Sequence, residues 1–574
     1  MSRPPVSRPP VSRLIAMFAV MMVVFGGIVV RLAFLQVRDT PGLEALGMQQ
    51  RVRTTTLPPR RGEIVDRTGV PLAVTREARD IYVDPRFVVD AETEAATVAG
   101  VLDLRASDVQ AALEAEGTFV WIDRQVDLEV AVELEELALP GIGFLEVAKR
   151  YYPAGPLASQ VLGFVNVDGA GAAGLELAYD EILAGTPGER TTELSADGLP
   201  IANGLDSLAA PVSGSTMLIT LDRQMQFMVQ AALERAVEDN DALAGTAVVM
   251  DPATGEVLAM ATYPGFDPNA YNEAPMEVMR NRAATDAFEP GSVNKIITAA
   301  AALETGVVTL DQRFRVPATM KVGPFTIEDS HPHPVESMTI GDIITESSNI
   351  GAALIAEQVG SMPLAGFMQR FGYGRTTGIG FPAEASGAML PGRDWDEVIR
   401  ATVSYGQGIS VTPLQLANVY ATIANGGRWM QPILVRGFEG PAGVFRPGDR
   451  RPTRRVIGAD TARLLTSMLA AAVEEGTGVN AQIPGYQVAG KTGTSRKLDE
   501  NGRYVQRYHA SFAGFLPAAD PRVVIAVSID EPRTVYGGLA AAPLFQEIAR
   551  YAIQRLAIPA APSVGLPPHA RGTS

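Results

Sequence analysis

The sequence predicts an α+β fold because apolar strand patterns at the two ends of one long region enclose helical patterns. The strand patterns form an early pair and a late group of three, at residues 246–250, 256–261, 487–495, 508–515 and 523–529. The early pair flanks Asp251-Pro252-Ala253-Thr254-Gly255, which is typical of a hairpin turn. An alanine-rich helical run at residues 296–303 lies between the two groups. We therefore expect an antiparallel sheet sandwiched by helices.

Length and composition restrict the class of protein. A chain of 574 residues is too long for a single hydrophobic core, so two or three domains are expected. The formal net charge is −16, which disfavours nucleic-acid binding because that function needs a basic face. Cysteine is absent from the sequence, which excludes disulfides, thiolate catalysis and cysteine-bound metals.

The N-terminal segment predicts a membrane anchor. Residues 1–13 repeat Ser-Arg-Pro-Pro-Val and form a short basic tail, and residues 14–36 are almost continuously apolar apart from Arg31. This length can cross a bilayer if Arg31 extends toward the interface. A cleavable signal peptide is the alternative, but no small-x-small cleavage site follows. The positive-inside rule then places the tail in the cytoplasm and the rest of the chain outside, in a single-pass plasma or inner membrane protein.

Two domains are expected after the anchor. Residues 37–209 contain a predicted hairpin turn at Asp66-Arg67-Thr68-Gly69 but do not combine a nucleophile, a base and a cleft pattern. Spacing or partner binding is the function we expect there. Residues 210–559 form the domain with the sheet, in which Asp222 is expected to cap a helix that runs to about residue 237. Residues 560–574 are rich in Pro, Ala and Gly and are expected to be a disordered tail.

A serine and a lysine three residues apart are the first candidate site. Pro290-Gly291 ends a loop, so a buried helix should begin near Ser292 and place Lys295 on the same face. A lysine held there out of water can lose its proton and act as a base for the serine. The alternative is a helix-capping serine followed by a lysine that extends to solvent. Only five of the 48 basic residues are lysines, which makes each lysine a candidate for a special role.

Two further polar motifs lie in the same domain. Ser347-Ser348-Asn349 occurs in a predicted connection between helices, where helix capping is the alternative interpretation. Lys491-Thr492-Gly493-Thr494 occurs on a predicted inner strand, although lysine and threonine are also common on edge strands. His331 and His333 are separated by proline in an extended loop, so no metal site is predicted.

The order S-x-x-K, S-x-N and K-T-G is the signature of penicillin-recognising serine enzymes. With it, nearly the whole chain resembles the class B penicillin-binding proteins, the monofunctional peptidoglycan D,D-transpeptidases. The segment Arg61–Gly69 and the motif Gly174-Leu175-Glu176 are similar to motifs of the family's pedestal, or dimerisation, domain. The segment from Ser330 to Asn349 most resembles the cell-division, FtsI-type members. Val293-Asn294 departs from the threonine-containing pair that is frequent in the family, at positions that should not touch the chemistry.

The resemblance implies a β-lactamase-like transpeptidase domain on an elongated pedestal, and it implies a role for each site residue. Ser292 is expected to be the nucleophile, Lys295 its base, Ser347 a proton relay and Asn349 a ligand of the substrate amide. Lys491, Thr492, Gly493 and Thr494 are expected to bind substrate, with the backbone N–H groups of Ser292 and Thr494 as the oxyanion hole. The implied substrates are stem peptides ending in D-Ala-D-Ala, and β-lactams are the implied inhibitors. Neither a cofactor nor a metal is implied, and the expected partners are a glycan polymerase and other membrane proteins of the division machinery.

The sequence leaves several alternative functions open. An elongation-type transpeptidase and a D,D-carboxypeptidase share the three motifs, and the carboxypeptidase differs only in using water as the acceptor. A β-lactamase is disfavoured by the anchor and the pedestal. A bifunctional class A enzyme is disfavoured because residues 39–209 leave no room for a glycosyltransferase domain. A β-lactam sensor or an inactive division scaffold is the non-enzymatic alternative.

Overall fold

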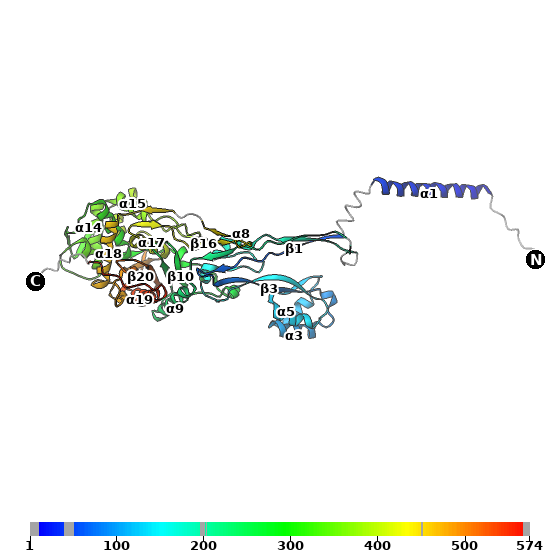
Figure 1. Ribbon diagram of the computed structural model, residues 1–574, viewed down its shortest axis with the longest axis horizontal. Helices are drawn as coiled ribbons and strands as arrows, with labels where there is room; N and C mark the ends of the chain where they lie inside the picture. The colour runs from blue at the N-terminus through cyan, green and yellow to red at the C-terminus, as the bar shows by residue number, and fades with distance from the viewer. Residues whose placement is uncertain (1–10, 39–50, 196–200, 203, 449–451, 566–574) are drawn as a thin grey trace, which may run out of the picture. The chain divides into compact units, whose positions relative to one another are not determined.

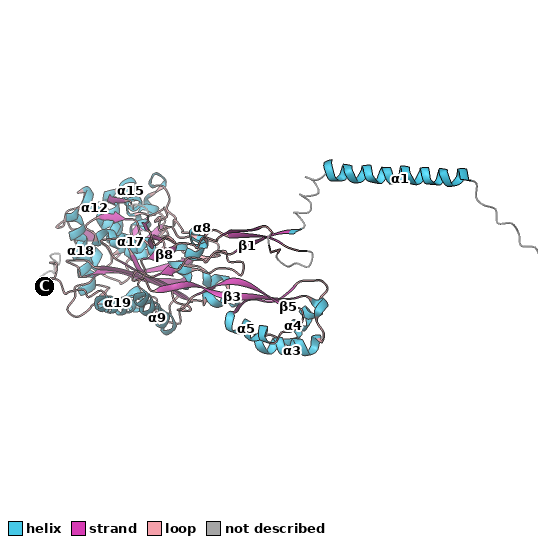
Figure 2. Ribbon diagram, turned by 45° about the vertical axis from the view of Figure 1, so that its right-hand side comes forward, coloured by secondary structure: helices cyan, strands magenta, loops and turns pink. Residues whose placement is uncertain are grey.

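The computed structural model describes residues 11–38, 51–195, 201–202, 204–448 and 452–565. It divides into two compact units. The first unit comprises residues 1–59 and 186–212, and the second comprises residues 60–185 and 213–574. Strands and helices are mixed throughout the second unit, which confirms the predicted α+β class (Figures 1 and 2).

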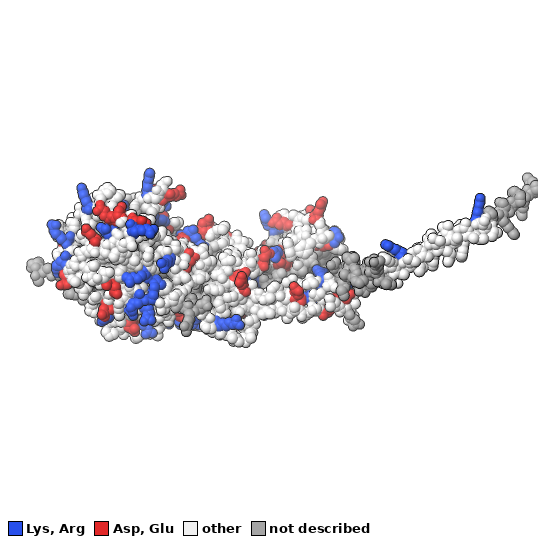
Figure 3. Space-filling model, turned by 90° about the horizontal axis from the view of Figure 1, so that it is seen from above, with Lys and Arg blue, Asp and Glu red and all other residues white. Residues whose placement is uncertain are grey.

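The first unit contains a long apolar helix and a small sheet. Helix α1 (Val11–Arg38) covers the predicted anchor of residues 14–36, and it is long and apolar enough to cross a bilayer. Its surface is uncharged except for basic side chains (Figure 3). The predicted tail of residues 1–13 lies mostly outside the described residues. The sheet is antiparallel, with strand order β1 (Val52–Leu57), β6 (Gly188–Glu193) and β7 (Asp206–Ala209).

The N-terminal part of the second unit is a lobe whose central part, residues 81–144, encloses a separate apolar core. Its elements in chain order are β2 (Ile64–Val65), β3 (Pro71–Val83), η1 (Pro85–Phe87), α3 (Ala91–Leu102), α4 (Ala106–Leu113), β4 (Val120–Asp127), α5 (Leu128–Glu136), β5 (Ile142–Tyr151), α6 (Ser159–Leu162), α7 (Gly174–Ala178) and α8 (Asp180–Ala184). Ile81 of β3 packs against Val98 of α3 and Leu134 of α5 in this core. The predicted turn at residues 66–69 is present, and the Asp66 carboxylate accepts the Thr68 and Val70 N–H groups at 2.8 and 2.9 Å.

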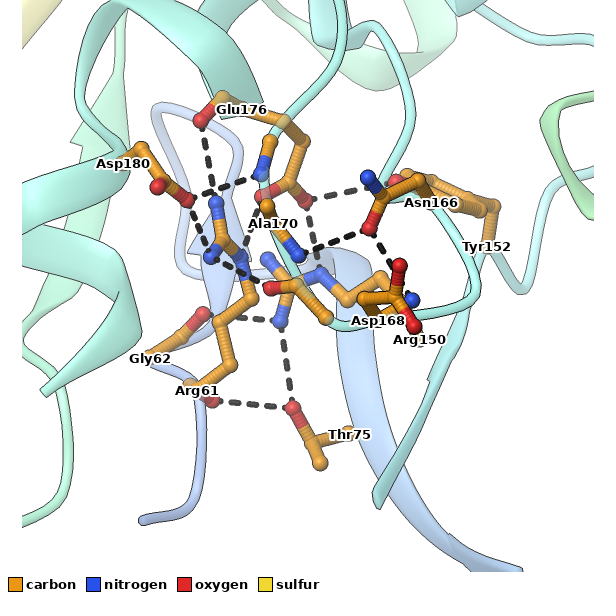
Figure 4. Close-up of polar contacts among 12 residues, drawn as sticks. Arg61, Gly62, Thr75, Arg150, Tyr152, Asn166, Asp168, Ala170, Glu176 and Asp180 are labelled. Atoms are coloured by element: carbon orange, nitrogen blue, oxygen red, sulfur yellow. Dashed lines mark hydrogen bonds and ion pairs between the residues drawn. The ribbon is translucent and has the colours of Figure 1, made fainter. Parts of the chain in front are cut away.

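A buried ionic network holds the beginning and the end of this lobe together (Figure 4). The carboxylate of Glu176, which is fully buried, accepts hydrogen bonds from Arg61 Nε at 2.6 Å and Arg150 Nε at 2.7 Å. Arg61 also donates to Asp180 at 2.6 Å, and Arg150 donates to the Gly62 carbonyl at 2.8 Å. Burial opposes the positive charge of Arg61, but Glu176 and Asp180 outweigh it and raise its pKa.

The rest of the second unit is built around a five-stranded antiparallel sheet. Its strand order is β10 (Val257–Tyr263), β9 (Ala244–Met250), β21 (Val523–Asp530), β20 (Tyr504–Leu516) and β19 (Ala489–Leu498). The early and late segments therefore meet in one sheet, as predicted. Helices α9 (Arg223–Asp239) and α19 (Gly537–Arg555) cover one face, where Leu233 and Phe545 pack against Val249 and Val527. The predicted Asp222 cap of α9 is present, with its carboxylate accepting Met225 N–H at 3.0 Å.

A second layer of helices covers the other face. Its longer helices are α12 (Lys295–Thr305), α14 (Asn349–Val359), α15 (Ser361–Phe371), α16 (Glu397–Ser404), α17 (Pro413–Ala424) and α18 (Ala459–Glu474). Shorter helical elements are η2 (Pro268–Glu273), α10 (Met276–Met279), α11 (Arg282–Thr285), η3 (Gly291–Asn294), α13 (Ile340–Thr345), η4 (Gly392–Asp394) and η5 (Val479–Ala481). Small two-stranded sheets are formed by β11 (Phe314–Val316) with β14 (Glu336–Met338), β12 (Thr319–Val322) with β13 (Phe325–Glu328), and β15 (Arg428–Met430) with β18 (Thr453–Arg455).

The lobe and the rest of the second unit share one sheet. Strands β17 (Phe445–Pro447), β16 (Val435–Glu439) and β8 (Thr216–Ile219) continue into β2, β3 and β4, and β2 runs parallel to β8. Glu256 supports this junction because it binds Arg436 from β16 and Arg67 from the turn after β2. At the C-terminus, Val564 exchanges backbone hydrogen bonds with the Gln487 side chain, at 2.6 and 3.3 Å. Residues 566–574 of the predicted disordered tail lie outside the described residues.

Candidate active site

Ser292 lies in a short 3-10 turn that leads directly into α12. The turn η3 and helix α12 both lack a side-chain cap, so the alternative of a capping serine is not observed. Gly291 precedes the serine with φ +60°, a conformation that favours glycine. A β-carbon at Gly291 would lie 2.8 Å from the Thr494 carbonyl oxygen, so only glycine lets this turn approach strand β19 so closely.

Lys295 brings the serine and the interhelical turn together. It is fully buried, and its Nζ lies 3.0 Å from Ser292 Oγ and 3.2 Å from Ser347 Oγ. Nζ also donates to the Ser347 carbonyl oxygen. Burial lowers the pKa of Lys295 well below its ordinary value, and the nearby charge of Lys491 lowers it further, against a smaller opposing effect of Asp329. The predicted desolvated lysine beside a serine is therefore present, and it favours the neutral amine.

Ser347 occupies the turn between α13 and α14, with φ +63°. This left-handed conformation is uncommon for a residue with a side chain and costs about 1–2 kcal/mol. It lets the same residue present both its carbonyl oxygen and its hydroxyl to Lys295. Ser348 caps α14 by accepting Gly351 N–H at 2.8 Å, so the capping interpretation of the motif holds for Ser348 but not for Ser347.

Asp329 fixes this turn, although it was not among the site residues predicted from the sequence. Its carboxylate accepts hydrogen bonds from the Ser348 hydroxyl at 2.6 Å, Ile350 N–H at 3.0 Å and Asn349 N–H. His333 Nε2 lies 3.0 Å from the same carboxylate, so this histidine of the proline-flanked loop acts as a neighbour of Asp329. A negative charge at the N-terminus of α14 is favoured by the helix dipole. Asn349 donates its side-chain amide to the Glu328 carbonyl at 2.9 Å, which orients the last residue of the motif.

The K-T-G motif lies on β19, which is the edge strand of the five-stranded sheet. The prediction of an inner strand was therefore wrong. A β-carbon at Gly493 would lie 2.9 Å from the Pro290 carbonyl oxygen, so this glycine keeps the strand close to the turn that carries Ser292. The Thr494 hydroxyl accepts Gly537 N–H at 3.0 Å at the start of α19.

Lys491 is buried next to Thr492 of its own strand and next to Thr477. It is 1% exposed, and its Nζ lies 3.3 Å from Thr477 Oγ1 and 3.5 Å from Thr492 Oγ1. The hydroxyls of Thr477 and Thr492 are 2.7 Å apart. Burial lowers the pKa of Lys491 to about 7, against the opposing charge of Glu346. Thr477, between Gly476 and Gly478, is a second residue that sequence reasoning missed.

One cavity of about 530 Å³ joins these parts. Ser292, Ser347, Asn349, Thr492 and Thr494 line it, whereas Lys295 and Lys491 lie beneath its surface. Its remaining walls come from Gly291, Ser330, His331, Tyr405, Gln407, Gly476, Thr477, Val479, Asn480, Tyr536, Gly537, Gly538 and Leu539. The structure thus brings the three predicted motifs to a single cleft.

Glu289 connects the segment before Ser292 to Gly408 and Tyr504. Its carboxylate accepts Gly408 N–H at 2.8 Å and the Tyr504 hydroxyl at 3.1 Å. Burial raises the pKa of Glu289 above its ordinary value.

Among the described residues, no three His, Asp or Glu side chains lie together as metal ligands.

A serine hydroxyl beside a buried, deprotonatable lysine, in a cleft with hydroxyl and amide groups, defines a serine acyltransferase site. The Penicillin binding protein transpeptidase domain family matches residues 245–550, and the Penicillin-binding Protein dimerisation domain family matches residues 56–217. The chain belongs to the class B penicillin-binding proteins.

Relatives cover nearly the whole chain. Peptidoglycan D,D-transpeptidase FtsI of Escherichia coli K12 is 36% identical over 533 residues, which are 90% of this chain and 87% of FtsI. Penicillin-binding protein PbpB of Mycobacterium tuberculosis is 36% identical over 582 residues, which are 96% of this chain and 86% of PbpB. The structure of penicillin binding protein 3 of Mycobacterium tuberculosis complexed with aztreonam is similar to this chain, with a TM-score of 0.71 and 32% sequence identity. The matched region covers 90% of this chain and 100% of the mycobacterial chain in that structure.

Proposed function

We propose that this chain is a peptidoglycan D,D-transpeptidase that cross-links stem peptides through an acyl-enzyme on Ser292. The observation that carries the proposal is the buried Lys295 amine 3.0 Å from Ser292 Oγ at the base of one cleft. The named transpeptidase relatives, including FtsI, support the same reaction.

Acylation begins at the carbonyl carbon between the two terminal D-alanines. Neutral Lys295 takes the proton of Ser292 as Oγ forms the new C–O bond. The backbone N–H groups of Ser292 and Thr494 donate hydrogen bonds to the developing oxyanion, for which each donor typically contributes about 10²-fold in rate. The C–N bond then breaks, and the leaving D-alanine amine receives a proton through Ser347 Oγ, which lies 3.2 Å from Lys295 Nζ.

Substrate recognition uses the unpaired edge of β19. An extended peptide can add to a free strand edge through main-chain hydrogen bonds, which suits a stem peptide. The hydroxyls of Thr492 and Thr494 reach the cleft directly, and the charge of Lys491 acts on the terminal carboxylate from beneath them. Asn349 holds the substrate amide, and Gly493 keeps the strand close to the nucleophile.

The second half of the reaction transfers the acyl group. An amine from a neighbouring stem attacks the ester carbon to form the new C–N bond, and its proton passes to the Lys295–Ser347 pair. The C–O bond to Ser292 then breaks, and Ser292 Oγ recovers its hydrogen from this pair. β-Lactams replace the D-Ala-D-Ala end and leave Ser292 acylated; the mycobacterial structure with aztreonam supports this inhibition.

Labelling with a fluorescent penicillin tests the site. Wild-type protein should take the label covalently, and Ser292→Ala should not. Equal labelling of both proteins, or absence of label on the wild type, contradicts the assignment. A second assay supplies a thioester substrate together with a D-amino acid acceptor and measures both products. A transpeptidase should transfer the acyl group to the acceptor, whereas a carboxypeptidase would give the hydrolysis product alone.

We further propose that α1 anchors the chain in the plasma or inner membrane, with residues 37–209 as pedestal, residues 210–559 as transpeptidase domain and both outside the cytoplasm. The arginines before α1 and the FtsI relative support this orientation and a septal role with a glycan polymerase and other division proteins. Depletion should give filaments. Rounded cells would instead support the elongation alternative.

A further inference from the structure

Five exposed arginines form a cluster on the part of the second unit that is built around the five-stranded sheet. Two of them, Arg370 and Arg375, lie at the end of α15 and in the turn that follows it. The other three belong to the small sheet of β15 and β18 and are Arg428, Arg454 and Arg455. Figure 3 looks onto the side that carries α15 in Figure 1, and several basic side chains gather in one area of that side. None of the five belongs to the proposed catalytic machinery.

The members of this arginine cluster lie close to one another. Arg454 donates two hydrogen bonds to the Arg370 carbonyl oxygen, from Nε at 3.1 Å and from Nη2 at 2.9 Å. Arg428 and Arg455 are direct partners across the two strands, so their side chains leave the small sheet on the same face. Burial lowers the pKa of Arg454, and the nearby charge of Arg375 lowers it further. Positive charge is therefore concentrated here against its own repulsion.

Carboxylates do not neutralise the arginine cluster. Among the residues that the structure describes, no Asp or Glu forms an ion pair with any of the five arginines. Glu384 approaches the turn after α15, but its carboxylate accepts the Thr377 N–H and hydroxyl at 2.5 and 2.6 Å. Such a cluster is unusual in a chain with a formal net charge of −16. Like charges that face each other across strands destabilise a sheet, so this arrangement indicates an anionic binding partner.

Aromatic rings hold two of the guanidinium groups in place. The guanidinium carbon of Arg454 lies 3.6 Å from the centre of the Trp429 ring, and that of Arg370 lies 3.8 Å from the centre of the Phe367 ring. Stacking covers one flat face of a guanidinium and leaves N–H donors available in its plane. Groups that are ordered before a ligand arrives lose less conformational entropy when they bind it.

Helix capping is the alternative explanation, and it accounts for only part of the arginine cluster. Arg454 pairs with a carbonyl at the end of α15, and Arg455 donates to the Gly426 carbonyl, just after α17, at 3.1 Å. The side chains of Arg375 and Arg428, in contrast, make no hydrogen bond or ion pair with a described residue. Capping therefore leaves two of the five charges unexplained.

The arginine cluster lies about one helix length from the nucleophile. Val411, just before α17, pairs with Phe288, which is four residues before Ser292. The other end of α17 leads directly into β15, which carries Arg428. A helix of 12 residues is about 18 Å long. An anionic ligand that reaches both places must therefore be extended or polymeric.

We propose that the arginine cluster binds carboxylates of peptidoglycan stem peptides and keeps the polymer beside the protein while one stem enters the catalytic cleft. Guanidinium groups bind carboxylates through paired N–H donors, and several groups in one area can hold several stems of the same polymer. The inference rests on the proposed function, because these stems are its substrate. Anionic phospholipid headgroups carry the same sign of charge, but the proposed reaction already brings the polymer within reach of the arginine cluster.

Binding is tested with the full-length protein in detergent and with purified peptidoglycan sacculi. Benzylpenicillin first blocks Ser292, so that the cleft does not hold a stem. Co-sedimentation should show saturable binding that weakens as ionic strength rises, because salt screens exposed charges. Sacculi whose carboxylates have been converted to amides should bind at least about tenfold more weakly. Equal binding of amidated sacculi would overturn the proposal.

Two substitutions at positions without other contacts test the arginine cluster itself. The double variant Arg375→Gln, Arg428→Gln should bind sacculi about tenfold more weakly than the wild type. The matched control is Arg503→Gln, Arg550→Gln, which removes two exposed and equally unpaired arginines outside the cluster and should bind like the wild type. Thermal unfolding should show no loss of stability in the first variant, because Arg428 faces only the like charge of Arg455.

Three outcomes contradict the arginine cluster as the binding site. They are wild-type binding by the first double variant, equal weakening in both double variants, and a loss of stability without weaker binding. The last result would make the arginines structural.

A competitor identifies the source of the negative charge. Soluble polyglutamate should release the protein from sacculi. Release by glycerol phosphate, at concentrations at which polyglutamate has no effect, would assign the arginine cluster to a phospholipid headgroup and overturn the proposal. Sacculus binding can also be measured in Ser292→Ala, because it does not need acylation. Failure of penicillin labelling therefore contradicts the proposed function, whereas binding that is independent of the arginine cluster contradicts only this inference.

Discussion

The carboxylate of Asp329 accepts a 2.6 Å hydrogen bond from the Ser348 hydroxyl, at the N-terminus of the helix that begins with Asn349. The same carboxylate accepts the N–H groups of Asn349 and Ile350. A residue outside the three motifs thus determines the position of the second motif. We infer that Asp329 is a positioning residue, since it does not line the cleft.

Replacing Asp329 tests this dependence. Asp329→Asn keeps the size of the side chain but removes the charge and places an amide N–H₂ group among donors. We expect a loss of about 1–3 kcal/mol in unfolding free energy and slower acylation by penicillin. Asp520→Asn, in an exposed loop, is the control and should change neither quantity. Unchanged acylation in Asp329→Asn would show that the turn is held by its other contacts.

The lowered pKa of Lys491, about 7, predicts a pH limit on substrate binding. Below pH 7 the ammonium is charged and attracts the substrate carboxylate, and above pH 7 this attraction is lost. The rate constant for β-lactam acylation should therefore fall on the alkaline side. Deprotonation of Lys295 acts in the opposite direction, because the neutral base is formed as pH rises through its lowered pKa.

Arginine at position 491 separates the two effects. Arginine stays charged at all accessible pH values, so Lys491→Arg should remove the alkaline fall even if its overall rate is lower. Lys321→Arg, on the exposed strand β12, is the matched control and should keep the wild-type pH profile. An alkaline fall of the same size in Lys491→Arg would assign it to another group.

Local patterns in the sequence were sufficient for much of the fold. The hairpin at residues 251–255, the Asp222 cap and the start of a helix after Pro290 depend on neighbours a few residues apart, and all three are present. The initial 3-10 turn was not foreseen, because it depends on how closely Gly291 approaches Thr494.

The missed features depend on residues that the tertiary fold brings together. Asp329 is 20 residues before Asn349, and Thr477 is 14 residues before Lys491, without a local motif around either. The edge position of β19 depends on the order in which strands pair, which the period of apolar residues does not specify. Motif chemistry is therefore readable from sequence, whereas the residues that position it are not.

The buried network of the N-terminal lobe should be sensitive to loss of one charge. Glu176→Gln leaves Arg61 and Arg150 buried without their shared carboxylate, which typically costs about 3–5 kcal/mol. Glu77→Gln is the control, since the Arg60–Glu77 pair is exposed and such pairs contribute about 0–1 kcal/mol. Urea unfolding should distinguish the two variants. Equal stability would mean that Asp180 and the backbone contacts are sufficient to hold the two arginines.

Ser347 has a left-handed backbone conformation, which lowers the stability of the folded protein. We predict that the serine is kept at this position for the chemistry of its hydroxyl. Ser347→Gly and Ser347→Ala both remove the hydroxyl that lies 3.2 Å from Lys295 Nζ, so both should slow acylation. Glycine adopts φ +63° without strain, so Ser347→Gly should be about 1 kcal/mol more stable than Ser347→Ala. Thermal unfolding and penicillin acylation measured on the same samples separate strain from chemistry. Equal stability of the two variants would mean that the turn changes conformation in Ser347→Ala, and wild-type acylation in both would remove Ser347 from the proton path.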